Sequence, residues 1–134
     1  MQTEQREANE VANMWYSAHI VMYFEYIDGG TQTDYHMYEN VFLVKAESHV
    51  EANLKGQQIG MKAESEGEGQ VWVGSRDAKT RFGGVRKTSE IIVEQSSKLQ
   101  LTDEVEVTYF EIWVETRAEL DSYISGERMF VQIQ

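Results

Sequence analysis

Cysteine is absent from this 134-residue chain. Its absence excludes disulfide bonds, thiolate catalysis and zinc sites built on cysteine. Long apolar runs are absent too, and none approaches the roughly 18 residues that a membrane-spanning helix needs. The first seven residues carry neither the basic stretch nor the apolar core of a signal peptide. We therefore expect a soluble cytoplasmic protein, with a cysteine-free secreted protein as the alternative.

Basic residues are few. Twelve Lys and Arg stand against 23 Asp and Glu, which gives a formal net charge of −11. A field of this sign repels phosphate backbones, so nucleic-acid binding is disfavoured. The same field would speed the encounter with a basic partner, although solubility alone is the simpler interpretation of the charge. With 41% hydrophobic and 11% aromatic residues, the chain still has the material for a folded core.

Catalytic motifs are missing as well. The sequence has no G-x-S-x-G nucleophile elbow and no glycine-rich phosphate loop that ends in lysine. The three histidines, His19, His36 and His49, fall in no metal-ligand spacing. The glutamates between positions 104 and 111 follow the solvated face of a predicted strand. We therefore predict a protein that is not an enzyme and uses no metal or cofactor, and we keep an unrecognised hydrolase as an alternative.

Two long β-rich segments open the ordered part of the chain. Apolar residues occupy almost all even positions from Tyr16 to Tyr26, and this period of two predicts a strand with one buried face. The segment 35–46 is a second predicted strand, and the Asp-Gly-Gly at 28–30 suits the turn of a long hairpin. The polar residues 1–13 are predicted to be a flexible acidic tail. Residues 14–134 then form a single domain.

Two capping boxes predict where helices begin. In this motif a Ser or Thr hydroxyl accepts from the amide three residues on, and a Glu at that position reaches back. Ser48-His49-Val50-Glu51 predicts a helix over residues 49–64, in which Gly56 and Gly60 permit close approach to a neighbouring element. Thr116-Arg117-Ala118-Glu119 predicts a short helix that ends at Gly126.

Four further segments are predicted strands, namely 71–73, 79–87, 105–114 and 129–134. Gly83-Gly84 predicts a bulge or a close backbone approach. A change of apolar phase near Tyr109 predicts another bulge, or burial on both faces. The expected fold is α+β: an antiparallel sheet of about five to six strands with two helices packed on one face, in the order β-β-α-β-β-β-α-β.

Two short motifs carry a family resemblance. Trp15-Tyr16-Ser17-Ala18 opens the first strand, and Phe82-Gly83-Gly84-Val85-Arg86-Lys87 lies in the middle of the chain. Over roughly residues 15–114 the sequence resembles an uncharacterised bacterial family, domain of unknown function 4288. The resemblance implies a small α+β fold and a bacterial or phage origin. It brings no established activity, so no catalytic residue is carried over.

The clearest anomaly in this acidic chain is a basic strand. Within a dozen positions it holds five basic residues and two glycines: Arg76, Lys79, Arg81, Gly83, Gly84, Arg86 and Lys87. Glycine amides beside guanidinium groups would suit a carboxylate or a phosphorylated small molecule. The alternative is a charged edge strand that is protected against aggregation, with its arginines paired to nearby glutamates.

Aromatic residues concentrate on the first hairpin. Trp15 and Tyr23 lie on its more polar face and are candidate contact residues, because Trp and Tyr are frequent at binding hot spots. Core packing is the alternative for both.

The sequence as a whole predicts a non-catalytic binding module. Its sharpest version is a small acidic protein that binds a protein partner, as an immunity or antitoxin-like protein does, and a basic partner would suit its charge. A module that binds a small or phosphorylated ligand on the basic strand is the alternative. The oligomeric state is open, and a homodimer is one of the alternatives.

Overall fold

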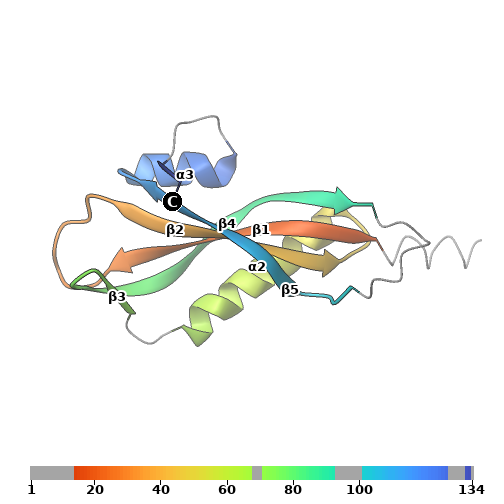
Figure 1. Ribbon diagram of the computed structural model, residues 1–134, viewed down its shortest axis with the longest axis horizontal. Coiled ribbons are helices and arrows are strands. Elements are labelled where there is room, and N and C mark those ends of the chain that lie inside the picture. The colour runs from red at the N-terminus through yellow and green to blue at the C-terminus, as the bar shows by residue number, and fades with distance from the viewer. Residues whose placement is uncertain (1–13, 68–70, 93–100, 127–131, 134) are drawn as a thin grey trace, which may run out of the picture.

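A computed structural model describes residues 14–67, 71–92, 101–126 and 132–133. The predicted acidic tail, residues 1–13, and most of the predicted last strand lie outside these residues. Six strands form one antiparallel sheet in the order β3-β4-β1-β2-β5-β6 (Figure 1). The elements along the chain are β1 (Trp15–Tyr26), β2 (Tyr35–Lys45), α2 (His49–Glu66), β3 (Val71–Val73), β4 (Arg76–Ile91), β5 (Val105–Val114), α3 (Arg117–Ser125) and β6 (Gln132–Ile133). The α+β class and the order of the elements are confirmed.

The first two strands form the predicted hairpin. β1 pairs with β2 from Trp15 opposite Lys45 to Tyr23 opposite Met37, without a break in register. On its other side β1 pairs with β4, so it lies inside the sheet. The backbone groups of β1 are therefore paired on both sides, and only its two faces need covering by other elements.

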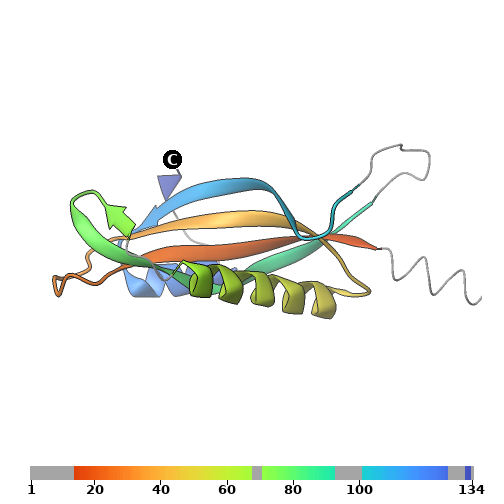
Figure 2. The same cartoon turned by 90° about the horizontal axis from the view of Figure 1, so that it is seen from below.

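The two helices cover opposite faces of the sheet. Ala18, at an even position of β1, packs with Ala52 of α2, whereas Val21 and Tyr23, at odd positions, pack with Leu120 of α3. Successive side chains of a strand point to opposite faces, and β1 has no register break against β2. Figure 1 shows α3 above the sheet and α2 below it, and Figure 2, seen from below, has α2 in front. The prediction of two helices on one face is wrong, because β1 is apolar on both faces at its centre.

Both helix caps are confirmed. The side chain of Ser48 accepts from the amide of Glu51, and that of Thr116 accepts from the amide of Glu119. Gly126 ends α3 in the left-handed region at φ 83°. Helix α2 runs two residues beyond its predicted end. No helix among the described residues is long and apolar enough to cross a membrane.

Small residues form the packing face of α2. Its buried residues are Ala52, Gly56 and Gly60. A Cβ atom at Gly60 would lie 2.3 Å from the ring of Phe82, so the helix approaches β4 as closely as glycine allows. This confirms the role predicted for the two helix glycines. Among the larger apolar side chains of α2, Ile59 packs against the core, and three are exposed, namely Val50, Leu54 and Met61.

Bulges shift the register of β4 against β1 and of β5 against β2. The pairing of β4 with β1 skips Gly83 and Arg86, which confirms the predicted bulge and adds a second one. β4 also extends past the predicted strand at both ends, since it runs from Arg76 to Ile91. In β5 the register against β2 shifts at Val107, two residues before the phase change seen in the sequence. Bulges of this kind increase local twist, in keeping with the strong curl of the sheet (Figure 2).

Candidate functional site

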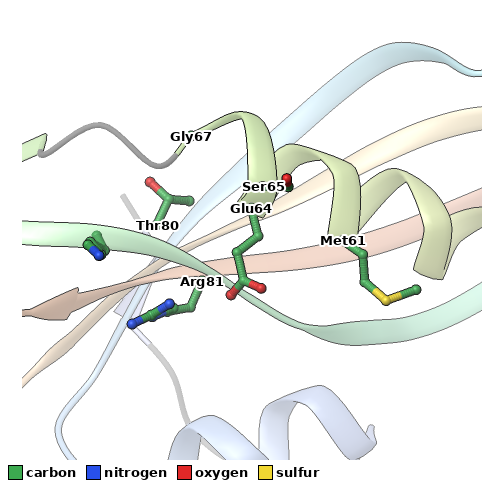
Figure 3. Close-up of a pocket in the computed structure, with 7 residues that line it drawn as sticks. Met61, Glu64, Ser65, Gly67, Thr80 and Arg81 are labelled. Atoms are coloured by element: carbon green, nitrogen blue, oxygen red, sulfur yellow. The ribbon is translucent and has the colours of Figure 1, made fainter.

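Two residues of the basic strand line a hollow. Lys79 and Arg81 of β4 face a space of about 420 Å³ at the C-terminal end of α2, together with Thr80, Glu64 and Met61 (Figure 3). Carbonyl groups at a helix C-terminus and a carboxylate both disfavour an anion there. The Glu64 carboxylate is itself engaged, because it accepts from the amide of Phe82 at 3.0 Å. The hollow thus presents both signs of charge.

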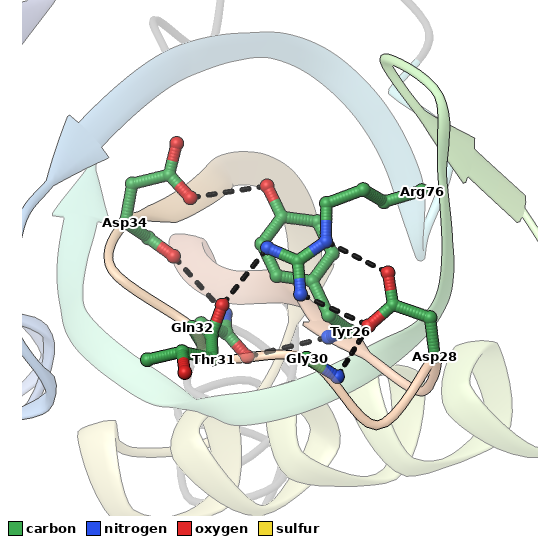
Figure 4. A network of polar contacts seen from close by, with 7 residues as sticks. All are labelled: Tyr26, Asp28, Gly30, Thr31, Gln32, Asp34 and Arg76. Atoms are coloured by element: carbon green, nitrogen blue, oxygen red, sulfur yellow. Dashed lines mark hydrogen bonds and ion pairs between the residues drawn. The ribbon is translucent and has the colours of Figure 1, made fainter.

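Arg76, at the start of β4, binds the turn that follows β1. Its guanidinium forms a two-bond pair with Asp28 at 2.8 and 2.9 Å and donates to the carbonyl of Thr31 (Figure 4). It also lies 3.7 Å from the centre of the Tyr26 ring. The hydrogen bonds from Arg76 and from the amide of Gly30 hold the pKa of Asp28 well below its usual range. This network joins the first hairpin turn to the start of β4.

The other two arginines also lie beside carboxylates. Arg81 is 3.3 Å from Glu25 of β1, in an exposed pair. Arg86, placed by its bulge on the face of α3, is 3.9 Å from Glu39 and donates to the carbonyl of Tyr123. These pairs are the ones expected of a charged strand whose arginines bind local acids.

Gly83 and Gly84 serve the packing of α3. A Cβ atom at either position would lie within 3 Å of the Ile124 side chain. Lys87 stands opposite His19 in the register. The structure therefore does not bring the seven residues of the basic strand to one site. Lys79 and Arg81 line the hollow, Arg76 is paired with Asp28, and Lys87 stands apart. The other three, Gly83, Gly84 and Arg86, contact α3. An anion site on this strand stays a prediction.

A buried carboxylate joins α3 to the sheet. Glu39 of β2 is 3% exposed and receives hydrogen bonds from His19 Nδ1 at 2.5 Å and from the hydroxyl of Tyr123. Burial raises the pKa of Glu39, but the hydrogen bonds from His19 and Tyr123 and the charge of Arg86 outweigh it, so the pKa lies below its ordinary value. Burial and the Glu39 carboxylate raise the pKa of Tyr123. Every oxygen of this carboxylate is occupied, which suits a structural role.

The two candidate contact aromatics differ in exposure. Tyr23 is buried in the core beside Leu120, and its hydroxyl accepts from Arg117 at 3.1 Å. For Tyr23 the core-packing alternative therefore holds. Trp15 is partly buried at the start of β1, with the ammonium of Lys45 5.9 Å from its ring.

A different group of aromatic side chains gathers beyond the C-terminal end of α2, on the same face of the sheet. Strands β1, β2, β3 and β5 all contribute, because the sheet curls enough to bring β3 opposite β5 around one hollow of about 260 Å³. We call this group the aromatic platform, and its members are Phe24, His36, Tyr38, Trp72, Tyr109 and Trp113.

Stacking orders the centre of the aromatic platform. The rings of His36 and Trp113 are parallel within 10°, with centroids 3.9 Å apart. Tyr38 contacts His36 on one side and Tyr109 on the other. Two members remain largely open to solvent, since Trp72 is 68% exposed and Tyr109 is 59% exposed. Large exposed aromatic groups of this kind are typical of contact surfaces.

One carboxylate lies beside the aromatic platform. Glu111 of β5 lies 2.5 Å from His36 Nε2 and is itself partly exposed. Burial and the nearby Glu111 charge raise the pKa of Tyr38. Within the described ranges no three His, Asp or Glu side chains are grouped to hold a metal ion. Aromatic faces beside a carboxylate suit the binding of a cation or an apolar side chain.

Sequence reasoning did not find the aromatic platform. Its six members come from segments up to 89 residues apart. Pairing of β1, β2 and β5 brings five of them together, and the curl of the sheet adds Trp72 of β3. One signal was present: His36 and Tyr38 stand at positions of the same parity in β2, next to Phe24 across the hairpin. That alternation marks a shared face.

Comparison with known proteins gives a family and no function. The model of the family described as Domain of unknown function (DUF4288) matches residues 15–108, which is more than half of the chain. The chain therefore belongs to this family, and the predicted resemblance is confirmed. No curated protein and no solved structure matches it. The family match ends within β5, before α3.

Proposed function

We propose that this member of the DUF4288 family is a non-catalytic module that binds a basic protein partner through the aromatic platform. The observation that carries the proposal is the exposure of Trp72 and Tyr109 at the rim of a stacked aromatic group. Tryptophan and tyrosine account for much of the binding energy at protein interfaces, because they bury a large area at little entropic cost.

Charge supports a basic partner. The chain has a net charge of −11, and Glu111 brings a carboxylate to the aromatic platform. A partner's arginine or lysine could lie over the exposed ring of Trp72 with Glu111 nearby. The long-range field would also speed the encounter. An immunity or antitoxin-like protein that neutralises a basic protein is the sharpest form of this proposal.

The test uses two variants that each remove an exposed apolar side chain. Trp72→Ala removes the most exposed ring of the aromatic platform, and Ile92→Ser removes an apolar side chain that is 91% exposed elsewhere. Proteins captured from host lysate by the wild-type chain are quantified by mass spectrometry, and each is then purified for titration calorimetry. We expect a basic partner whose affinity falls at least tenfold with Trp72→Ala and not with Ile92→Ser. A partner that binds all three proteins equally, or one that is acidic, would contradict the proposal.

A second candidate function is the binding of a small anionic ligand. The observation that favours it is that two cationic side chains, Lys79 and Arg81, line one hollow of about 420 Å³. Thermal-shift measurements with nucleoside phosphates test it. A rise in melting temperature that disappears in Arg81→Ala would support the anion site, and an unchanged response in that variant would eliminate it.

A further inference from the structure

Within the described residues, none pairs with the outer edge of β5 from Val105 to Phe110, and this part of the strand is rich in apolar side chains. On its inner side β5 pairs with β2, and on its outer side the described residues of β6 reach only Ile112 and Trp113. Residues 105–110 are exposed on both faces of this strand. Four of them are large and apolar, with exposed fractions of 38% to 59%, namely Val105, Val107, Tyr109 and Phe110.

The opposite edge of the sheet carries charged side chains. Beyond its pairing with β3, the outer edge of β4 carries charged residues, among them Lys79, Arg81 and Lys87. The Glu64 side chain also occupies the amide of Phe82 on that strand. Charged side chains and covered amides protect an edge strand against pairing with another chain. Strand β5 has no Lys, Arg or Pro, and its charged residues are Glu106 and Glu111, so the charge along its edge is acidic and does not repel a basic strand.

We propose that the partner adds an extended basic strand to the edge of β5, between Val105 and Phe110. The proposal rests on the function proposed above and specifies how the partner binds. Main-chain hydrogen bonds would supply affinity, and alternate side chains of the added strand would supply specificity. Those on the α2 side would lie next to Tyr109 and so continue the aromatic platform.

Charge selects a basic strand over a second copy of this chain. Every charged residue of β5 is a glutamate, Glu106 and Glu111, and Glu104 stands just before it. Two copies would each bring this acidic edge and a net charge of −11. A strand in which Arg or Lys alternates with apolar residues would instead place cations opposite the glutamates, and opposite charges across a strand pair stabilise it.

The probes are synthetic eight-residue peptides in which arginine alternates with valine, labelled for fluorescence anisotropy. A version with glutamate in place of arginine tests the charge. A series methylated at one backbone nitrogen at a time tests the pairing, because alternate amides of a strand point to opposite edges. We expect no binding of the glutamate peptide. Methylation at every second residue should weaken binding at least tenfold, and the positions between should be tolerated.

Variants of the protein test where the peptide binds. Val107→Arg puts a positive charge on the open edge, at a side chain that is 58% exposed, and Ile92→Arg adds the same charge elsewhere. We expect a loss of at least tenfold with the first variant and less than twofold with the second. Near-ultraviolet circular dichroism of each variant checks that the fold is retained.

The possible failures are separable. If the arginine peptide binds and loses affinity with Trp72→Ala but shows no alternation with methylation, strand addition is wrong and binding at the aromatic platform stands. If alternation appears but Trp72→Ala has no effect, strand addition stands and the aromatic platform is not the contact. If sedimentation velocity shows a dimer that Val107→Arg dissociates, the occupant of the edge is a second copy and the proposal is overturned. The absence of any peptide binding overturns it too.

Discussion

Replacement of Glu39 by glutamine should destabilise this domain. The loss should be larger than for the same replacement, carboxylate by amide, in any other ion pair described above. Glu39 is 3% exposed and lies among His19, Tyr123 and Arg86. Glutamine has nearly the same shape but no charge, and its NH₂ group must face one of the donors that now surround the carboxylate. One hydrogen bond is therefore lost, and Arg86 loses its buried counter-charge.

The size of the effect follows from these contacts. A hydrogen bond to a charged group contributes about 1.5–3 kcal/mol, and loss of one partner of a buried ion pair costs about 3–5 kcal/mol. Arg86 keeps its bond to the Tyr123 carbonyl and remains partly in contact with solvent, which reduces the second term. We expect the free energy of unfolding to fall by about 3 kcal/mol, toward the lower end of that range.

Urea denaturation at pH 7, followed by tryptophan fluorescence, measures this change. The control is Glu25→Gln, which removes the carboxylate of the exposed pair with Arg81 and should cost about 0.5 kcal/mol or less. If both variants lose the same small amount, the carboxylate of Glu39 is not the tie between α3 and the sheet that the contacts indicate.

The pH dependence gives a second readout for Glu39. Its pKa is lower in the folded state than in the unfolded chain, so its stabilising contribution is complete above the unfolded value. That contribution is lost as the pH falls from the ordinary range of a glutamate through the lowered folded value. The wild-type protein should therefore lose more stability between pH 7 and pH 3 than Glu39→Gln does.

Three further outcomes are expected. Gly60→Ala should lower the free energy of unfolding by about 1–2 kcal/mol, because overpacking against the nearby aromatic ring exceeds the gain in helix propensity; urea denaturation that shows a gain would contradict the close approach. Carbon-13 NMR titration should find that the pKa of the Asp28 carboxyl group lies well below the usual range of an aspartate and returns toward that range in Arg76→Lys. Glu104→Gly should stabilise the protein by about 0.5 kcal/mol because Glu104 has a φ of 57°, whereas Glu106→Gly in the strand should destabilise it by about as much.

Local rules predicted the elements and their ends. Ser48, Thr116 and Gly126 cap helices through short-range hydrogen bonds, which depend on three or four neighbouring residues and can therefore be seen in the sequence. The faces of the sheet could not be assigned as well. Val21 and Tyr23 interrupt the even alternation of β1, and this interruption is the trace of the second buried face beneath α3.

The candidate site depended on contacts between distant segments. The residues of the basic strand are close in sequence, and they were therefore predicted to form one binding surface. In the structure its three arginines instead form ion pairs with carboxylates of β1, β2 and the first turn. The aromatic platform combines residues that are distant in sequence. Trp72 and Trp113 are 41 residues apart and line the same hollow because the sheet curls. The curl of a sheet arises from the twist and the bulges of several neighbouring strands. The apolar pattern within one strand therefore does not predict it.

The two-sided covering of β1 has a consequence for the motions of the domain. Amides of β1 are bonded to strands on both sides and lie beneath a helix on each face, so their hydrogen exchange should require unfolding of the whole domain. Amides on the outer side of β5 between Val105 and Phe110 should exchange through small local openings. The sheet thus passes from a rigid centre to an edge that can rearrange, and a binding partner can be accommodated there without disturbing the core.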